Sequence, residues 1–195
     1  QSGEQSILFL NKRGHSSFVF CRKCGFVKRC DDCDVSMTYH RRQDFLICHY
    51  CGKTARIPMV CPECASNRIG HFGAGTEQVE AYTRSLFPDA RIARMDADTT
   101  GTKGAYERFY TQMKERQIDI LIGTQMIAKG LDFEGVSLVG ILMADISLNL
   151  PDYRANEKTY QLISQVSGRS GRGEVPGRVI LQTYHPTHFA ITTAS

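Results

Sequence analysis

Eight cysteines fall into four closely spaced pairs, and they are the side chains of this chain best suited to binding a metal ion. Each pair has the spacing CxxC, and all eight lie between Cys21 and Cys64. A CxxC turn presents two thiolates to one ion, and two such turns complete a tetrahedral zinc site. The pairs are Cys21 with Cys24, Cys30 with Cys33, Cys48 with Cys51, and Cys61 with Cys64. The sequence therefore predicts two zinc ions, each bound by four cysteines.

Spacing alone leaves open which pairs share an ion. Only five residues separate Cys24 from Cys30, so binding the first two pairs to one ion would need a very tight loop. This disfavours sequential pairing and leaves crossed and nested arrangements. Disulfides are the alternative for these thiols, but a chain of this type is expected in a reducing compartment. Four separate pairs also suit two tetrahedral ions better than an iron–sulfur cluster.

The two predicted metal sites are expected to be structural. Four thiolates around one zinc ion leave no position for a reactive water molecule, so hydrolysis at these sites is not expected. His40 and His49 lie close to the third pair in the sequence. Because eight thiolates are already present, we expect both histidines to be surface or packing residues.

Two other segments have the residue types that phosphate chemistry needs. The first is GTQMIAKGLDF, residues 123–133, and the second is QVSGRSGR, residues 165–172. The guanidinium groups of Arg169 and Arg172 offer planar, paired donors to phosphate and stay charged at all physiological pH values. The neighbouring glycines let the backbone approach a nucleotide closely. A GRxGR sequence alone is equally compatible with a basic turn, so the presence of both segments carries the interpretation.

A third segment, RMDADTT at residues 94–100, is open to two interpretations. Its hydroxyl groups, Thr99 among them, are able to donate to a DNA phosphate. Alternatively, Thr99, Thr100 or Thr102 caps the amino terminus of a helix that begins near residue 103. Asn11, Lys12 and Arg13 raise a similar pair of alternatives. They either contact a DNA backbone or lie in a solvated loop.

An alternation of apolar runs and helical patterns must position these residues. We predict buried strands at residues 6–10, 90–95, 119–124, 137–143 and 178–183, and helices at residues 77–87, 103–116 and 156–166. This order predicts an α/β fold with a mostly parallel sheet. Ligand sites in such sheets lie beyond the carboxyl ends of the strands.

The cysteine-rich segment interrupts one strand–helix unit of this fold. It follows the strand at residues 6–10 and ends before the helix at residue 77, so it should emerge at the functional edge. We predict an inserted zinc-binding domain at residues 15–71 and an α/β lobe formed by residues 1–14 and 72–195. A chain of 195 residues is long enough for one core with a small second domain.

Charge and composition limit the kinds of protein that this chain can be. The formal net charge is +4 and the hydrophobic fraction is 42%. Residues 12–71 contain eleven Lys or Arg against five Asp or Glu, so their net charge is +6, or +2 when two four-thiolate zinc sites are included. A nucleic-acid surface is therefore possible there without being established by charge. No long apolar run or signal peptide is visible, so we expect a cytoplasmic protein and no membrane contact.

The two phosphate-type segments resemble the motifs of superfamily 2 helicases. The first matches motif V, TxxxA(R/K)GxD, through Thr124, Ala128, Lys129, Gly130 and Asp132. The second matches motif VI, QxxGRxGR, through Gln165, Gly168, Arg169, Gly171 and Arg172. The resemblance implies a RecA-like second helicase lobe, whose arginines reach ATP held by the other lobe.

The resemblance also implies a role for each matched residue. The catalytic residues would be Arg169, Arg172 and Gln165. The nucleotide would be bound by Gly130, Asp132, Gly168 and Gly171. Contacts to DNA would come from Thr124, Gln125 and Lys129 of motif V, and we add Arg13 and Thr99 by position in the predicted fold. Because motif V contacts both ligands, it would couple hydrolysis to movement along DNA.

The whole combination resembles the primosomal protein N′ family of bacterial replication-restart DNA helicases. Four CxxC pairs between FLNKRG and GAGTE, followed by MDADTT and both motifs, carry this resemblance across essentially the whole chain. It implies nested metal sites, with Cys21, Cys24, Cys61 and Cys64 at one zinc and Cys30, Cys33, Cys48 and Cys51 at the other. It also implies 3′ to 5′ unwinding at stalled forks, with a zinc module that aids unwinding and assembly. The implied partners are forked and single-stranded DNA, primosome proteins and the single-stranded DNA-binding protein, with the protein itself a monomer.

The chain departs from a complete helicase in one respect. It contains neither a GxxxxGK(S/T) phosphate loop nor a DExH motif, which would hold the phosphates and Mg²⁺. We therefore expect ATP and Mg²⁺ to bind only with a first lobe that the chain lacks, and no ATPase activity from the chain alone. The alternative function is a non-enzymatic zinc-ribbon adaptor for nucleic acid or protein. A zinc element of the topoisomerase or polymerase type is disfavoured by the helicase motifs.

Overall fold

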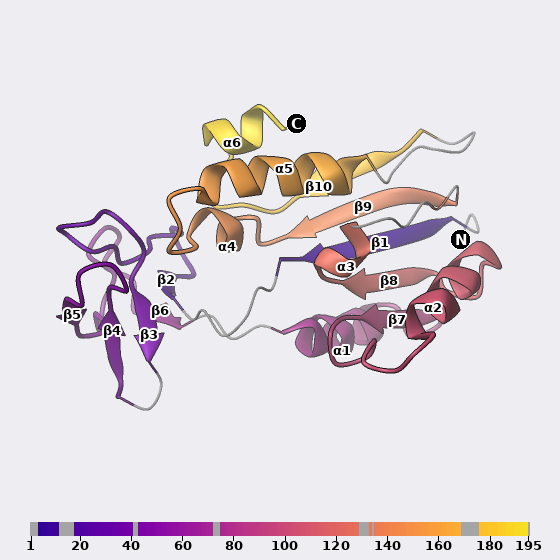
Figure 1. The fold of residues 1–195 in the computed structure, drawn as a ribbon, viewed down its shortest axis with the longest axis horizontal. Coiled ribbons are helices and arrows are strands. Elements are labelled where there is room, and N and C mark those ends of the chain that lie inside the picture. Colours follow the sequence, from indigo (N-terminus) through magenta and orange to yellow (C-terminus); the bar gives the residue numbers. More distant parts are fainter. Residues whose placement is uncertain are drawn as a thin grey trace.

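The computed structural model describes residues 4–11, 18–40, 43–71, 75–128, 133, 135–168 and 176–194. They form two parts that lie side by side (Figure 1). We call residues 4–11 together with the described residues from 75 onward the α/β lobe. We call residues 18–71 the cysteine module. The module follows the first strand of the lobe and precedes its first helix.

The α/β lobe is built on a parallel sheet. Its strands are β1 (Gln5–Leu10), β7 (Ile92–Met95), β8 (Ile120–Gly123), β9 (Val136–Leu142) and β10 (Arg178–Leu181). Their order across the sheet is β10-β9-β1-β8-β7, and every pairing is parallel. The five predicted strands are all present, with bounds shifted by at most two residues. The predicted α/β fold with a parallel sheet is confirmed.

Helices cover the two faces of this sheet unequally. The three predicted helices are present as α1 (Thr76–Leu86), α2 (Ala105–Lys114) and α5 (Ala155–Ser167). Three further helices of four residues each were not predicted: α3 (Gln125–Ala128), α4 (Asp145–Leu148) and α6 (Phe189–Thr192). Ile7 and Phe9 face the main core together with residues of α2, α3 and α5, whereas α1 lies on the opposite face. Right-handed crossovers explain this, because the chain runs from β1 outward to β7 and then turns back across the sheet. No helix among the described residues is long and apolar enough to cross a bilayer.

The start of α2 corrects one prediction. Its N-cap residue is Gly104, with φ 80°, and no side chain caps the helix. The hydroxyls of Thr99 and Thr100 instead donate to the backbone carbonyl of Asp96, at 3.3 and 2.5 Å. The predicted cap by Thr99, Thr100 or Thr102 is therefore wrong, because two of these hydroxyls already belong to the turn that follows β7.

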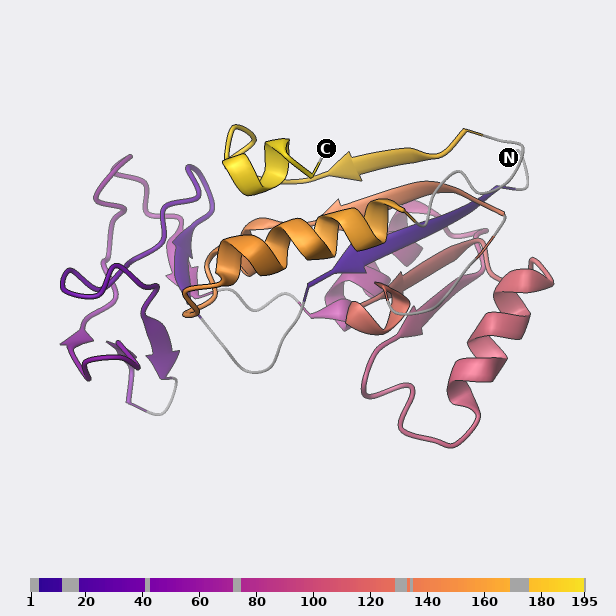
Figure 2. The same cartoon turned by 45° about the horizontal axis from the view of Figure 1, so that its top comes forward.

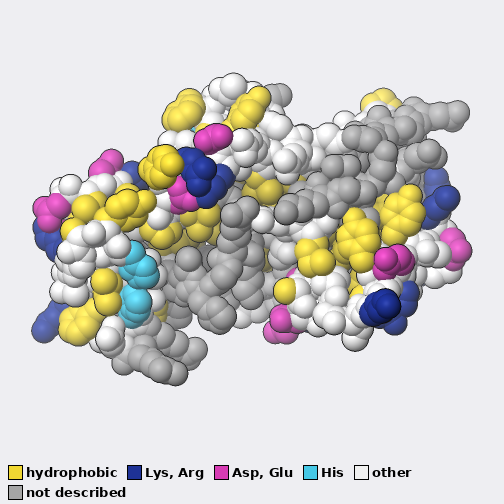
Figure 3. Space-filling view, in the orientation of Figure 1, with side chains coloured by type: hydrophobic (Ala, Val, Ile, Leu, Met, Phe, Trp, Pro, Cys, Tyr) yellow, Lys and Arg dark blue, Asp and Glu magenta, His cyan; other side chains and the backbone are white. Residues whose placement is uncertain are grey.

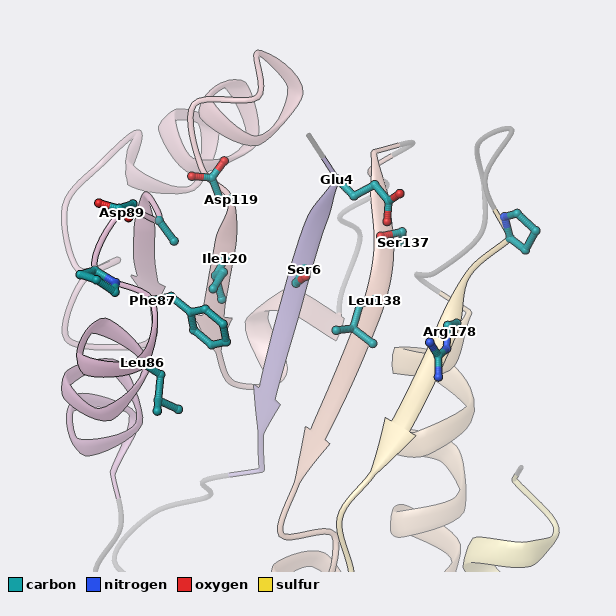
Figure 4. Close-up of a pocket in the computed structure, with 13 residues that line it drawn as sticks. Glu4, Ser6, Leu86, Phe87, Asp89, Asp119, Ile120, Ser137, Leu138 and Arg178 are labelled. Carbon is teal, nitrogen blue, oxygen red and sulfur yellow. The ribbon is translucent and has the colours of Figure 1, made fainter. Parts of the chain in front are cut away.

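A groove of about 780 Å³ lies on the face that carries α1 (Figure 4). It is lined at the amino ends of four strands by Glu4, Ser6, Asp119, Ile120, Ser137, Leu138 and Arg178, and on the α1 side by Leu86 and Phe87. Of the candidate site residues that the structure describes in the two phosphate-type segments, Thr124, Gln125, Gln165 and Gly168, none lines this groove.

The cysteine module has little regular structure. β2 (Val19–Cys21) pairs with β6 (Ile69–His71), and β3 (Thr38–His40), β4 (Phe45–Ile47) and β5 (Thr54–Ala55) form a second antiparallel sheet. Strands of two or three residues are too short for a periodic apolar pattern, so the sequence did not predict them. The buried core contains Val19, Met37 and Leu46 beside two of the cysteines.

A shared apolar cluster connects the module to the lobe. Its buried members are Leu10, Phe18, Phe20, Val27 and Ile146, with Val79, Leu142, Met143 and Tyr184 packed against them. Phe18, Phe20 and Val27 come from the module, and the others come from four elements and two loops of the lobe. No pattern in the sequence indicates this junction, since its members lie up to 174 residues apart.

Candidate metal centres and phosphate-binding edge

All four cysteine pairs adopt the same turn. The residue after the second cysteine has a positive φ in each: Gly25 at 81°, Asp34 at 51°, Gly52 at 77° and Ala65 at 52°. This left-handed residue brings its backbone N–H to 2.9 Å from the carbonyl oxygen of the first cysteine in every pair. We call each turn a knuckle and number the knuckles in chain order. The sequence CxxC has therefore produced four equivalent turns, each with two thiols on one side.

The knuckles group their sulfur atoms in two sets of four. Site 1 contains Cys21, Cys24, Cys61 and Cys64, and site 2 contains Cys30, Cys33, Cys48 and Cys51. Within each set the sulfur atoms all lie within 4.8 Å of one another, and Cys21 and Cys64 are 3.6 Å apart. Four thiolates at about 2.3 Å from one zinc ion would lie about 3.8 Å apart, whereas a disulfide is only about 2 Å long. The grouping is nested, and its dimensions fit one zinc ion per site.

The backbone of each site favours an ionised thiol. Burial raises the pKa of Cys21, but hydrogen bonds from the backbone N–H groups of Cys24 and Lys23 outweigh it and lower the pKa to about 7. At site 2 the backbone N–H groups of Cys51 and Tyr50 lower the pKa of Cys48, also to about 7. Each site thus has one thiol that is readily available as a thiolate, the form that binds metal.

The two histidines of the module contact each other. The Nε2 atoms of His40 and His49 are 2.9 Å apart and the ring centroids are 5.1 Å apart. Figure 3 shows two histidine side chains next to each other on the module surface. Neither belongs to the two groups of four cysteines.

The described parts of motifs V and VI meet on one face of the lobe. Helix α3 holds the start of motif V and follows the carboxyl end of β8, while motif VI begins near the end of α5 (Figure 2). Ile127 of α3 belongs to the same buried cluster as Ile163 and Val166 of α5. Gln165 and Gly168 are exposed to solvent beside this contact. Segments separated by some forty residues are thereby brought together, with the side chain of Gln165 exposed beside them.

Seven of the predicted site residues lie outside the described residues. They are Arg13, Lys129, Gly130, Asp132, Arg169, Gly171 and Arg172. Lys12 lies outside them as well.

A polar network ties the start of motif V to the end of β1. The side-chain amide of Gln125 donates to Oδ1 of Asn11 at 2.9 Å, and Nδ2 of Asn11 donates to the hydroxyl of Ser147 in α4. Asn11 is only 3% exposed. The alternative that its side chain contacts a DNA backbone is therefore wrong, because that side chain is turned inward. Thr124, beside Gln125, is half-buried.

Asp96 organises the turn that contains Thr99. Its carboxylate accepts hydrogen bonds from Thr76 at 2.5 Å, from Arg94 at 2.5 Å and from the backbone N–H of Thr99 at 3.1 Å. Burial raises the pKa of this carboxyl, but these donors and the charge of Arg94 hold it below its usual range. The sequence suggested carboxylates here without distinguishing this buried one from its exposed neighbours.

Sequence reasoning missed a second buried carboxylate, Asp145 at the start of α4. It accepts hydrogen bonds from the hydroxyl of Thr183 at 3.0 Å and from the backbone N–H of Tyr184, and its Oδ1 lies 2.8 Å from Nδ1 of His185. It thus holds the segment after β10 against the carboxyl end of β9. An acidic residue inside the apolar run MADISL was the only sequence signal for it.

Comparison with known proteins agrees with this geometry. The model of the PriA DNA helicase cysteine-rich region matches residues 30–56, and that of the helicase conserved C-terminal domain matches residues 62–174. The chain is 58% identical over 189 residues to replication restart protein PriA of Bacillus subtilis, covering 97% of this chain and 24% of that protein. It is 50% identical to PriA of Synechocystis, covering 95% and 23%, and 43% identical to PriA of Chlamydia trachomatis, covering 98% and 26%. The chain thus spans about a quarter of the length of these relatives.

Proposed function

Because this chain belongs to the helicase C-terminal domain family, in the form that carries the PriA cysteine-rich region, we propose that it is the second motor lobe of an ATP-dependent DNA helicase. The helicase moves 3′ to 5′ and acts in replication restart and primosome assembly at stalled forks. Residues 1–14 and 72–195 form the lobe, and residues 15–71 form an inserted zinc domain that aids unwinding and binds partners. These partners include the single-stranded DNA-binding protein.

The packing of α3 against α5 is the observation that best supports this function. It holds the beginnings of motifs V and VI side by side on an exposed part of the lobe. In the proposed enzyme, Arg169 and Arg172 stabilise the charge that develops on the transferred phosphoryl group, and Gln165 lies beside them. Gly130, Asp132, Gly168 and Gly171 face the nucleotide. Arg13, Thr99, Thr124, Gln125 and Lys129 contact the DNA backbone in that enzyme, and the last three of them belong to motif V.

The two four-cysteine sites support a proposal of two structural zinc ions. Their sulfur positions fit tetrahedral coordination, and four thiolates leave no open position for water. The zinc ions would hold the module in its fold and take no part in hydrolysis. ATP and Mg²⁺ would bind in the proposed helicase only when the first lobe supplies the phosphate loop and the DExH motif.

Reconstitution with the first lobe tests the proposed motor. The first lobe, supplied in trans or by fusion, should give DNA-stimulated ATPase activity, while the chain alone should give none. Arg172→Ala should then lower the rate of hydrolysis by about 10³-fold or more, as expected for an arginine finger. Arg56→Ala, at an exposed arginine of the cysteine module, is the matched control and should retain the full rate.

The same ATPase assay distinguishes the proposed helicase lobe from the alternative function, a non-enzymatic zinc-ribbon adaptor. Unchanged turnover by Arg172→Ala would contradict the role given to motif VI. A reconstituted protein that binds zinc and DNA but never hydrolyses ATP would instead support the non-enzymatic zinc-ribbon adaptor.

A further inference from the structure

The two metal sites differ in their relation to the lobe. Site 2 lies in the module core, whose members all come from residues 19–69. Site 1 includes the first knuckle, Cys21 to Gly25, and this knuckle contacts Tyr184 at the far end of the chain. Tyr184 follows β10 and belongs to the lobe.

Tyr184 touches the first knuckle on three sides. Before the knuckle, the ring of Phe20 lies edge-on to the tyrosine ring, with centroids 6.2 Å apart. Within it, the carbonyl of Arg22 accepts a hydrogen bond from the tyrosine hydroxyl at 3.0 Å. At its end, Gly25 lies so close that a Cβ at this position would overlap the Cβ of Tyr184. Contacts before the turn, within it and at its end define both the position and the direction of the knuckle.

The lobe in turn holds Tyr184 rigidly. The backbone N–H of Tyr184 donates to the buried carboxylate of Asp145, which also binds Thr183 and lies beside His185. Asp145 is 5% exposed and begins α4, directly after β9. A continuous set of contacts therefore runs from the central sheet through Asp145 and Tyr184 to site 1.

We propose that Tyr184 is a positioning residue that fixes site 1 to the α/β lobe, so that site 1 is part of a rigid joint and site 2 is not. The metal at site 1 then has two functions, because it closes the module and keeps the first knuckle in the shape that Tyr184 fits. The metal at site 2 has only the first function. The module consequently turns with the lobe as one body, which gives it a set direction relative to the motor.

The four knuckles provide a matched control for this joint. Gly25 and Gly52 follow the second cysteine of their knuckles with almost the same φ, 81° and 77°. A Cβ at Gly25 would collide with Tyr184, whereas a Cβ at Gly52 would have nothing within 4 Å. Ala65 occupies the same position in the fourth knuckle, so the turn itself accepts an alanine. Gly25→Ala and Gly52→Ala thus share the backbone strain and differ in the contact with Tyr184 and its neighbour His185.

The test measures rotational tumbling in the zinc-loaded chain by ¹⁵N relaxation, with zinc per chain determined alongside. In the unmodified chain, amides of the module and of the lobe should have one correlation time. Gly25→Ala and Tyr184→Ala should shorten the correlation time of the module while zinc stays at about two per chain. Gly52→Ala should behave like the unmodified chain, and Tyr184→Phe, which keeps the ring packing, should lie nearer to it than Tyr184→Ala does.

Common tumbling in Tyr184→Ala would overturn the joint, and so would equal behaviour of Gly25→Ala and Gly52→Ala. Both Gly25→Ala and Gly52→Ala should keep about two zinc ions, and loss of zinc from either variant would contradict a contact that only positions site 1. A functional consequence rests on the proposed motor: in the full-length parent, Tyr184→Ala should lower the DNA unwound per ATP hydrolysed. If the unmodified parent has no ATPase activity, the proposed helicase function is wrong. The proposed joint at Tyr184 is tested separately, by the tumbling measurement.

Discussion

The α/β lobe and the cysteine module are held together by different forces. In the lobe, Phe9, Leu121 and Ile141 are almost completely buried within one large apolar cluster between the sheet and its helices. In the module, the cluster at site 2 has Val19, Met37 and Leu46 beside two cysteines, while Phe18, Phe20 and Val27 are buried against residues of the lobe. Burial of apolar surface is therefore sufficient for the lobe but small for the module. We therefore expect metal binding to supply most of the free energy of folding of the module and none of that of the lobe.

Removal of metal is the strongest test of this difference. Structural zinc contributes roughly 10–16 kcal/mol of apparent binding free energy in small domains at pH 7, so chelation should unfold the module. The lobe should keep its helices and its parallel sheet. Circular dichroism and amide hydrogen exchange, with zinc release followed by a colour indicator, would measure both. Loss of protection in β1, β8 and β9 at the same chelator concentration would contradict the difference between the regions.

The same leucine truncation in each region sharpens the comparison. Leu121 in β8 and Leu46 in β4 are both fully buried. Leu121→Ala should lower the free energy of unfolding of the lobe by about 2–5 kcal/mol. Leu46→Ala should leave the lobe unchanged and appear as weaker zinc binding, by about 30-fold or more, because the lost packing and the metal stabilise the same module.

Denaturant unfolding of the lobe and zinc competition would separate these two effects. Unchanged zinc affinity in Leu46→Ala would mean that the metal sites form without the apolar core of the module.

Acid should affect the two regions in different pH ranges. Protons compete with zinc for the thiolates of the module. The pKa of Cys21 and of Cys48 is about 7 before metal binds. The zinc affinity of the module should therefore fall as the pH drops from 7 toward 5. In the lobe, the pKa of Asp96 is lowered on folding, which gives stability above the unfolded carboxyl pKa of about 4. That stability is lost only as the pH falls through the lowered pKa.

Asp96→Asn isolates the carboxylate in the lobe. It should cost about 1–3 kcal/mol at pH 7, because the hydrogen bonds from Thr76 and Arg94 lose their charged acceptor. The difference from the unmodified chain should shrink below pH 4. Thermal unfolding at several pH values would measure it, and a difference independent of pH would exclude the charge as its cause.

The smallest expected effect concerns a single knuckle. Ala65 has φ 52°, a conformation that costs about 1–2 kcal/mol for a residue with a Cβ. Ala65→Gly removes this strain but adds freedom to the unfolded chain, so zinc affinity should change by no more than about tenfold. Competition with a chelator would measure it. A larger change would mean that the alanine methyl group has a packing function in the fourth knuckle.

The sequence predicted those parts of the fold that have long patterns. All five strands of the lobe carry buried apolar runs, and α1, α2 and α5 are long enough for a helical period. Helices of four residues, such as α3 and α4, are formed by tertiary contacts and leave no period to detect. The cap of α2 was wrong because Asp96 uses the hydroxyls of Thr99 and Thr100, a competition that only the folded turn reveals.

The sequence also predicted part of the candidate site, namely the features that depend on residue spacing along the chain. Cysteine spacing predicted four knuckles and two sites, but it left crossed and nested pairing open, because pairing depends on how β2 and β6 bring the first and last knuckles together. Motif spacing indicated two segments that we propose bind phosphate, and this assignment stays a prediction. Asn11 was misjudged because a polar residue after a strand is usually exposed, and here Gln125 and Ser147 bind it inside. Tyr184 was missed because its partners lie some 160 residues earlier in the chain.

The central place of β1 has a consequence for how the protein is made. β1 leaves the ribosome before the other strands of its sheet, and its neighbours β8 and β9 begin only at Ile120 and Val136. All eight metal ligands are synthesised before either neighbour, so the module can capture zinc while β1 still lacks both partners. Pairing over such distances in the chain is slow. The contact between Tyr184 and the first knuckle can form only after residue 184 has been made, when the whole module has already been synthesised.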